Sequence, residues 1–205
     1  MTHIVSTLFI SLDGVAEVDP AWHFPYFDEA MGAAVSEDYS GVDVLLLGRV
    51  TYQSFAGAWP DREAAGGEDA TFATQLGDAR KVVATRNPEP LGWRNAEPAA
   101  DLLDTVAALR SEPGVGKVLI PGSLSIVRQL LAAGELDELR LLVHPVVAGK
   151  GERLFDETSG LRPLRLLRSA IFPTGVVRLA YAPAELPGPA SQAEAGEQTP
   201  GDQEA

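Results

Sequence analysis

The chain has 205 residues and 45% of them are hydrophobic, so it can bury one substantial core and is most simply a single domain with a tail. It contains no cysteine, which excludes disulfides, zinc–thiolate sites, iron–sulfur clusters and thiol nucleophiles. Its formal net charge of −13 argues against a nucleic-acid partner, which would favour a basic face, but allows a nucleotide cofactor held by one or two local cations.

The placement of the histidines and of the apolar runs argues against a metal site and a membrane partner. His3, His23 and His144 lack the spacing of metal ligands. No apolar run reaches membrane-spanning length, and the N-terminal residues lack the cationic and apolar regions of a signal peptide. We therefore expect a cytoplasmic protein.

The first predicted strand covers residues 4–12, which are rich in β-branched side chains, and a tight turn follows at Asp13 and Gly14. Residues 15–25 are predicted to be irregular, and their aromatic cluster can either cover a site or pack as a connection. A helix is predicted over residues 26–39, where one apolar stripe recurs at helical spacing.

Residues 44–47 form a continuous apolar run, which is typical of a strand buried on both faces of a largely parallel sheet. Gly48 ends the run, and a helix is expected to begin within the next few residues. Such a turn directs backbone N–H groups and the helix dipole towards an anion, and the Arg49 guanidinium and Thr51 hydroxyl can add to it. Spacing alone fits a plain turn with a surface arginine equally well.

The middle of the chain is predicted to contain three further helical stretches and a strand. Residues 55–76 are polar and rich in glycine, which predicts a short helix, an exposed loop and another helical turn. A third strand is expected over residues 80–85, and Arg86-Asn87-Pro88 terminates it. Asp101 is a predicted N-cap for a helix whose apolar side chains are Leu102, Leu103, Val106 and Leu109.

A second strand–turn–helix unit begins at residues 117–120, continues through Pro121, Gly122 and Ser123, and ends its helix at Gly134. It repeats the arrangement at Gly48. Two such turns at carboxyl ends of strands in one sheet predict a crevice for a ligand.

The last elements are a strand over residues 139–147, interrupted by Pro145, and two segments, 164–171 and 176–181, that read as a hairpin. The order of elements predicts a mixed sheet with a helix layer on each face. Residues 185–205 hold five carboxylates and no lysine, arginine or aromatic residue, so we expect a domain over residues 1–184 and a disordered acidic tail after it.

Five short motifs in this order carry a family resemblance over most of the chain. They are Ser11-Leu12-Asp13-Gly14, Leu47-Gly48-Arg49-Val50-Thr51-Tyr52, Pro121-Gly122-Ser123-Leu124, Asp137-Glu138-Leu139-Arg140-Leu141, and the stretch from Pro145 through Gly149-Lys150-Gly151 to Leu154-Phe155. The chain resembles the dihydrofolate reductase-like family, in the branch of the riboflavin-biosynthesis reductase (RibD C-terminal) domain. This implies a three-layer α/β/α fold with a mixed, mostly parallel sheet that ends in a C-terminal β-hairpin.

The resemblance also implies an NADPH-dependent reductase that transfers hydride to a small, heteroaromatic substrate, similar to 5-amino-6-(5-phosphoribosylamino)uracil reductase. It assigns eight residues to the cofactor: Gly48, Arg49 and Thr51 at a phosphate, Thr85 and Arg86 near the adenosine 2′-phosphate, and Gly122, Ser123 and Leu124 beneath the pyrophosphate and nicotinamide.

Two acids are candidate catalytic residues by the same resemblance. Asp13 matches the acid of the Ser-x-Asp-Gly motif on the substrate side, although the residues alone fit a turn aspartate that caps backbone N–H groups. Asp28 stands one residue after Phe27, which occupies the position of the acid in members that reduce dihydrofolate. One residue rotates a helical side chain by about 100°, so Asp28 need not face the pocket, and dihydrofolate is a doubtful substrate.

Two alternatives stay open at this point: a nucleotide-binding or regulatory protein without turnover, and an oligomeric structural protein without a ligand. The late strands add a further expectation. Their apolar edge would invite aggregation if left in water, and related reductase domains associate through this part of the sheet, so we expect a homodimer.

Overall fold

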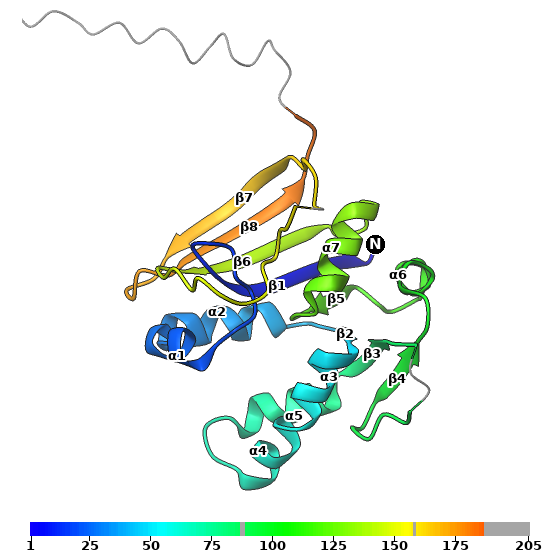
Figure 1. Ribbon diagram of the computed structural model, residues 1–205. Coiled ribbons are helices and arrows are strands. Elements are labelled where there is room, and N and C mark those ends of the chain that lie inside the picture. Colours follow the sequence, from blue (N-terminus) through cyan, green and yellow to red (C-terminus); the bar gives the residue numbers. More distant parts are fainter. Residues whose placement is uncertain (87–88, 158, 187–205) are drawn as a thin grey trace, which may run out of the picture.

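The computed structural model describes residues 1–86, 89–157 and 159–186. Its strands form one sheet in the order β4-β3-β2-β5-β1-β6-β8-β7 (Figure 1). The pairs within it are parallel except β6–β8 and β8–β7, which are antiparallel. The strands are β1 His3–Ser11, β2 Val44–Gly48, β3 Arg80–Ala84, β4 Ala96–Ala99, β5 Lys117–Ile120, β6 Glu138–His144, β7 Leu164–Ile171 and β8 Val177–Pro183.

The helices cover both faces of this sheet. One core cluster packs α6 and α7 against the strands, and two others pack α2, α3 and α5 against the opposite face. This confirms the predicted α/β fold with a mixed, mostly parallel sheet and a C-terminal hairpin. The helices are α1 Pro20–His23, the 3₁₀ turn η1 Phe24–Tyr26, α2 Glu29–Tyr39, α3 Arg49–Ala56, α4 Trp59–Ala65, α5 Ala70–Asp78, α6 Leu102–Ser111 and α7 Leu124–Ala133.

The position of β2 explains why polar and apolar residues do not alternate along this strand. Val44 and Leu46 belong to the cluster under α6 and α7, whereas Leu45 and Leu47 belong to the cluster on the other face. All four side chains are buried, as expected for a central strand with helices on both sides.

Several predicted helix ends are confirmed by their capping contacts. The Asp101 carboxylate accepts a hydrogen bond from the Asp104 N–H at 3.0 Å, and Gly134 ends α7 with a φ of 73°, in the left-handed region. The segment 15–25, expected to be irregular, contains α1 and the first part of η1. Asp19 caps α1 by accepting the Ala21 N–H at 2.8 Å, and Pro20 stands at its first position.

Two element boundaries differ from the prediction, and one strand was not predicted. Helix α2 begins at Glu29 rather than at residue 26, because η1 precedes it. Strand β6 ends at His144, so Pro145 follows the strand and does not interrupt it. Strand β4 was not predicted; it lies at the sheet edge and pairs only with β3.

A buried ion-pair network ties α2 to the antiparallel part of the sheet. Asp38, on α2, is 0% exposed. One of its carboxylate oxygens accepts hydrogen bonds from Arg140 Nη1 at 2.7 Å and from Arg178, and the other accepts the Thr7 hydroxyl at 2.6 Å. Arg140 also donates to Glu138 at 2.7 Å. The two arginines therefore balance a carboxylate that has no access to water.

Most of the predicted acidic tail lies outside the described residues, so its disorder stays a prediction. Among the helices of the described ranges, none has the length and apolar character needed to cross a membrane.

Candidate functional site

A cleft of about 930 Å³ runs across the carboxyl ends of β3, β2, β5 and β1. Its volume is in the range of small-molecule and cofactor sites. The structure brings together in its lining all eight residues that the sequence assigned to a cofactor: Gly48, Arg49, Thr51, Thr85, Arg86, Gly122, Ser123 and Leu124. The two predicted acids, Asp13 and Asp28, are not among the lining residues.

The two predicted turns are joined to each other by Ser123. Its hydroxyl accepts the Gly48 N–H at 2.6 Å and shares a hydrogen bond with the Thr51 hydroxyl at 2.8 Å. This position requires a φ of 74° at Ser123, in the left-handed region that favours glycine, and Gly122 before it has a φ of 141°. A strained backbone is thus used to place one hydroxyl between two turns.

Two helix N-termini open onto the same part of the cleft. Helix α3 begins directly after Gly48, and α7 begins directly after Ser123; neither has a side-chain cap. The first N–H groups of a helix have no partner inside it and carry the positive end of the helix dipole. The convergence of two such ends favours an anionic ligand.

Two arginines add formal positive charge. Arg49, at the start of α3, donates from Nη2 to the Glu89 carboxylate at 2.8 Å, and its Nε is buried without a partner among the described residues. Arg86 follows β3 and is exposed at the cleft. An anion in this region would meet both the guanidinium groups and the helix ends.

The cleft also has apolar walls that the sequence analysis did not assign to a site. Leu103 is one of the apolar side chains predicted for its helix; it is 48% exposed and, with Leu102, lines the β3 end of the cleft. Leu8, Phe9 and Val18 line the β1 end. These residues offer flat apolar surface to ring systems at both ends of the cleft.

Asp13 is held by contacts of its own turn and the neighbouring loop. Its carboxylate accepts the N–H groups of Ala148 and Gly149, each at 2.9 Å, and the Ser11 hydroxyl at 2.6 Å. The hydrogen bonds from Ser11, Ala148 and Gly149 lower the pKa of Asp13 well below its usual range. Asp13 therefore remains ionised and ties the β1 turn to the loop after β6.

Asp28 caps α2, where its side chain accepts the Met31 N–H at 2.9 Å. This use of an aspartate at an N-cap position is common, and it accounts for the residue without a catalytic role.

Two histidines that are far apart in the sequence meet beside the β1 end of the cleft. His23 Nδ1 lies 3.2 Å from His144 Nε2, and both side chains are buried. The ring of Phe9, which lines the cleft, packs 4.3 Å from the ring of His23. No local sequence pattern predicts this pair, because the two histidines lie in different elements of the fold.

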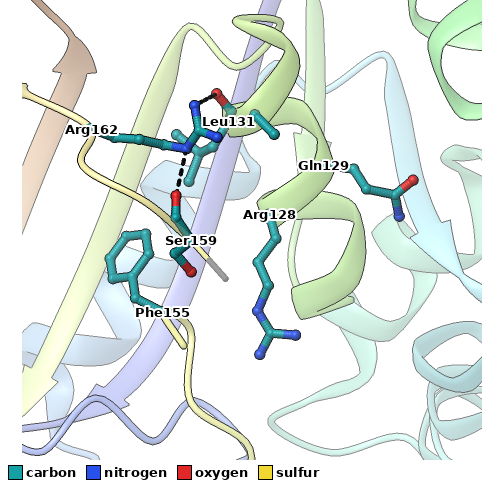
Figure 2. A pocket seen from close by; sticks show the side chains of 7 residues that line it. Arg128, Gln129, Leu131, Phe155, Ser159 and Arg162 are labelled. Atoms are coloured by element: carbon teal, nitrogen blue, oxygen red, sulfur yellow. Dashed lines mark hydrogen bonds between the residues drawn. The ribbon is translucent and has the colours of Figure 1, made fainter. Parts of the chain in front are cut away.

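A smaller cavity of about 210 Å³ lies beside α7, and Figure 2 shows the arginines around it. Arg162 donates to the Ser159 carbonyl at 3.0 Å and to the Leu131 carbonyl at 3.4 Å. Arg128 donates to the Leu154 carbonyl at 2.9 Å and to the Glu152 carboxylate at 2.8 Å. Since Glu152 lines the large cleft, Arg128 supports one wall of it.

Nowhere in residues 1–86, 89–157 and 159–186 do three or more histidine, aspartate or glutamate side chains gather as metal ligands would.

Comparisons with known proteins agree with this architecture. Among solved structures, a putative riboflavin biosynthesis protein from Shewanella sp. PV-4 superposes with a TM-score of 0.66 at 17% identity, over 90% of this chain and 100% of the other. RibD from Acinetobacter baumannii superposes with a TM-score of 0.65 at 15% identity, over 90% of this chain and 59% of RibD. These likenesses establish a shared fold.

In sequence, the chain is 26% identical over 183 residues to YyaP of Bacillus subtilis (strain 168), an uncharacterized protein; the match covers 87% of this chain and 93% of YyaP. The family model of the RibD C-terminal domain matches residues 2–178, which include the whole sheet except the end of β8 and every residue of the cleft. The chain belongs to the RibD C-terminal domain family.

Proposed function

We propose that the protein is a reductase that uses NADPH to transfer hydride to a small, heteroaromatic substrate. The observation that carries this proposal is the meeting of two uncapped helix N-termini and two arginines in one cleft with apolar walls. Its family adds support, since the reductase domain of RibD proteins belongs to it.

The residues present fit such a cofactor. Gly48 and Gly122 let the backbone approach a phosphate closely, Arg49 and the helix ends would hold the pyrophosphate, and Arg86 would hold the 2′-phosphate beside Thr85. NADPH, when bound, supplies the hydride, and the protein contributes binding and orientation. Leu103 offers apolar contact to the adenine end.

The substrate would occupy the β1 end, which Phe9, Leu8 and Val18 line. Asp13, predicted to be catalytic, would act there as a positioning residue, because its carboxylate already holds the Ala148 and Gly149 N–H groups. Asp28 would keep its capping role.

Calorimetric titration with NADPH and NADH tests the cofactor assignment. A charge-assisted contact to the 2′-phosphate contributes roughly 1.5–3 kcal/mol, so NADPH should bind at least about tenfold more tightly than NADH. Arg86→Ala should remove this preference, whereas Arg49→Ala should weaken both cofactors. Arg80→Ala is the matched control, because Arg80 stands at the opposite end of β3 and pairs with Glu97 and Glu112. Equal affinity for the two cofactors in the wild type would contradict the role of Arg86.

A nucleotide-binding protein without turnover is the second candidate, and it is favoured by the absence of Asp13 and Asp28 from the cleft lining. Substrate-dependent oxidation of NADPH distinguishes the two: turnover supports the reductase, and tight NADPH binding without turnover of any carbonyl or heteroaromatic compound tried supports the alternative.

We further propose a homodimer that covers β7. This edge strand has exposed side chains along most of its length, including Leu166, Leu167 and Ile171, and a long apolar edge invites pairing with another chain. Light scattering at micromolar concentration should give twice the 21.7 kDa of one chain. Ile171→Lys should shift the mass towards that of the monomer, whereas Leu161→Lys, at an equally exposed leucine outside the strands, should not. A wild-type mass near 21.7 kDa refutes the dimer.

A further inference from the structure

The segment 19–27, made of α1, η1 and their flanking residues, packs beside the β1 end of the cleft. Glu17 and Val18, which line the cleft, lead directly into it. Phe9 lines the cleft and also packs against the ring of His23, with ring centroids 4.3 Å apart. The position of this segment therefore shapes the end of the cleft assigned above to the substrate.

One polar contact holds the segment on the sheet. The hydrogen bond between His23 Nδ1 and His144 Nε2 is, within the described ranges, the only one that joins residues 19–27 to another part of the chain. The remaining hydrogen bonds of the segment are internal, such as those of Asp19 with Ala21 and of Phe27 with Phe24. The other contacts are those of rings.

The direction of the hydrogen bond follows from its surroundings. The Leu142 carbonyl lies 3.0 Å from His144 Nδ1 and can only accept, so Nδ1 of His144 carries the hydrogen. Neutral His144 then has a bare Nε2 that accepts, and His23 Nδ1 must donate. If His144 Nε2 also carried a proton, two N–H groups would face each other across this contact and the hydrogen bond would be lost. If His23 Nε2 gained a proton, the imidazolium cation would be buried among aromatic rings.

No carboxylate among the described side chains packed around the pair balances such a charge; the Leu142 and Ile10 carbonyls favour a protonated His144, but burial outweighs them. From β1 comes the ring of Phe9, from α1 Trp22, and from η1 and the residue after it Phe24, Tyr26 and Phe27. Of these side chains, Tyr26 alone carries an ionisable group, and it is not a carboxylate. The carboxylates at the two ends of the segment, Asp19 and Asp28, accept backbone N–H groups of their own helices.

We propose that the His23–His144 pair is a pH-sensitive latch, which holds residues 19–27 against the β1 end of the cleft at neutral pH and releases them on acidification. This role is independent of which cofactor the cleft takes.

The sign follows from the proton affinities. Burial, with a smaller contribution from the charge of His144, lowers the pKa of His23 from 6.5 to about 4, and burial also lowers the pKa of His144. The docked segment thus binds protons less readily than the released one. The free energy that holds the segment in place is fully present above pH 6.5, and it is lost progressively as the pH falls towards 4. From His23 alone, the released fraction should rise roughly 30-fold between pH 7.5 and pH 5.

Hydrogen exchange measured by mass spectrometry tests the latch in the wild-type chain. After correction for intrinsic exchange, protection of peptides spanning residues 19–27 should fall roughly 30-fold from pH 7.5 to pH 5, while peptides from α7 keep theirs. In His23→Phe/His144→Phe, which removes both titrating groups and keeps a ring in each place, protection in 19–27 should no longer depend on pH. His3→Gln is the matched control, because His3 is exposed on β1 and should leave the pH dependence intact.

Protection of residues 19–27 that is equal at the two pH values in the wild type overturns the proposal, and this comparison needs no variant. If protection still depends on pH in a folded His23→Phe/His144→Phe variant, checked by circular dichroism, the proposal is overturned as well.

Discussion

Replacing Gly48 with alanine is expected to lower the affinity for NADPH by a factor of about ten or more. The backbone of Gly48, with φ −80° and ψ 163°, accepts any residue, so the effect does not arise from strain at this position. A Cβ there would meet the Ser123 hydroxyl oxygen at 2.4 Å and its Cβ at 2.9 Å. One of the two joined turns must move, at a cost of about 1–3 kcal/mol, and the aligned helix ends are lost. Calorimetry with NADPH measures the change.

Gly32→Ala is the matched control for this variant. Gly32 lies in α2, and an added Cβ would meet only the Phe27 ring, at 3.8 Å, an ordinary contact. It should leave cofactor binding unchanged and can raise stability, because alanine is the better helix former. Adding Ser123→Gly to Gly48→Ala removes the atoms in conflict and should restore part of the affinity. A Gly48→Ala protein that binds like the wild type would show that the two turns do not form the site.

Asp38→Ala is expected to lower the free energy of unfolding by about 3–5 kcal/mol. The substitution leaves Arg140 and Arg178 without the carboxylate that both contact, and Asp38 is 0% exposed, so water cannot replace it without opening the structure. Chemical denaturation followed by circular dichroism gives the change in free energy.

Glu97→Ala controls for the loss of an ion pair as such. Glu97 pairs with Arg80, but its side chain is 51% exposed, so its loss should cost less than about 1 kcal/mol. If the two variants were equally stable, the buried network would contribute no more than a surface pair.

The elements that could be predicted from the sequence are those whose signal is local. The apolar run of β2, the N-cap Asp101 and the glycine after α7 each specify their element through neighbouring residues. Strand β4, Ala96–Ala99, has no such signal: it contains a proline and lies at the edge, and its extended form comes from pairing with β3. Helix α1 did have a local signal, the pair Asp19-Pro20, which a closer analysis of the caps would have found.

The candidate site divides in the same way. Its eight cofactor residues follow strands or begin helices, so their motifs and the rule for carboxyl ends of parallel strands predict that they meet. The bridge from Ser123 to Gly48 and the pairing of His23 with His144 join residues far apart in the chain and depend on atomic distances in the folded state. The place of Leu103 at the cleft could not be predicted either, because helical periodicity does not distinguish a buried apolar side chain from one that faces a cleft.

The place of β1 in the sheet affects how the chain can fold while it is being synthesised. This strand is synthesised before both of its partners, because it lies between β5 and β6, and its register pairs His3 with Lys117 and Ser11 with His144. Its apolar side chains, Ile4, Val5, Leu8 and Ile10, must wait for most of the domain to be translated before they are covered. Such distant pairing slows folding and leaves a nascent chain open to aggregation, so the protein should depend on ribosome-associated chaperones during synthesis.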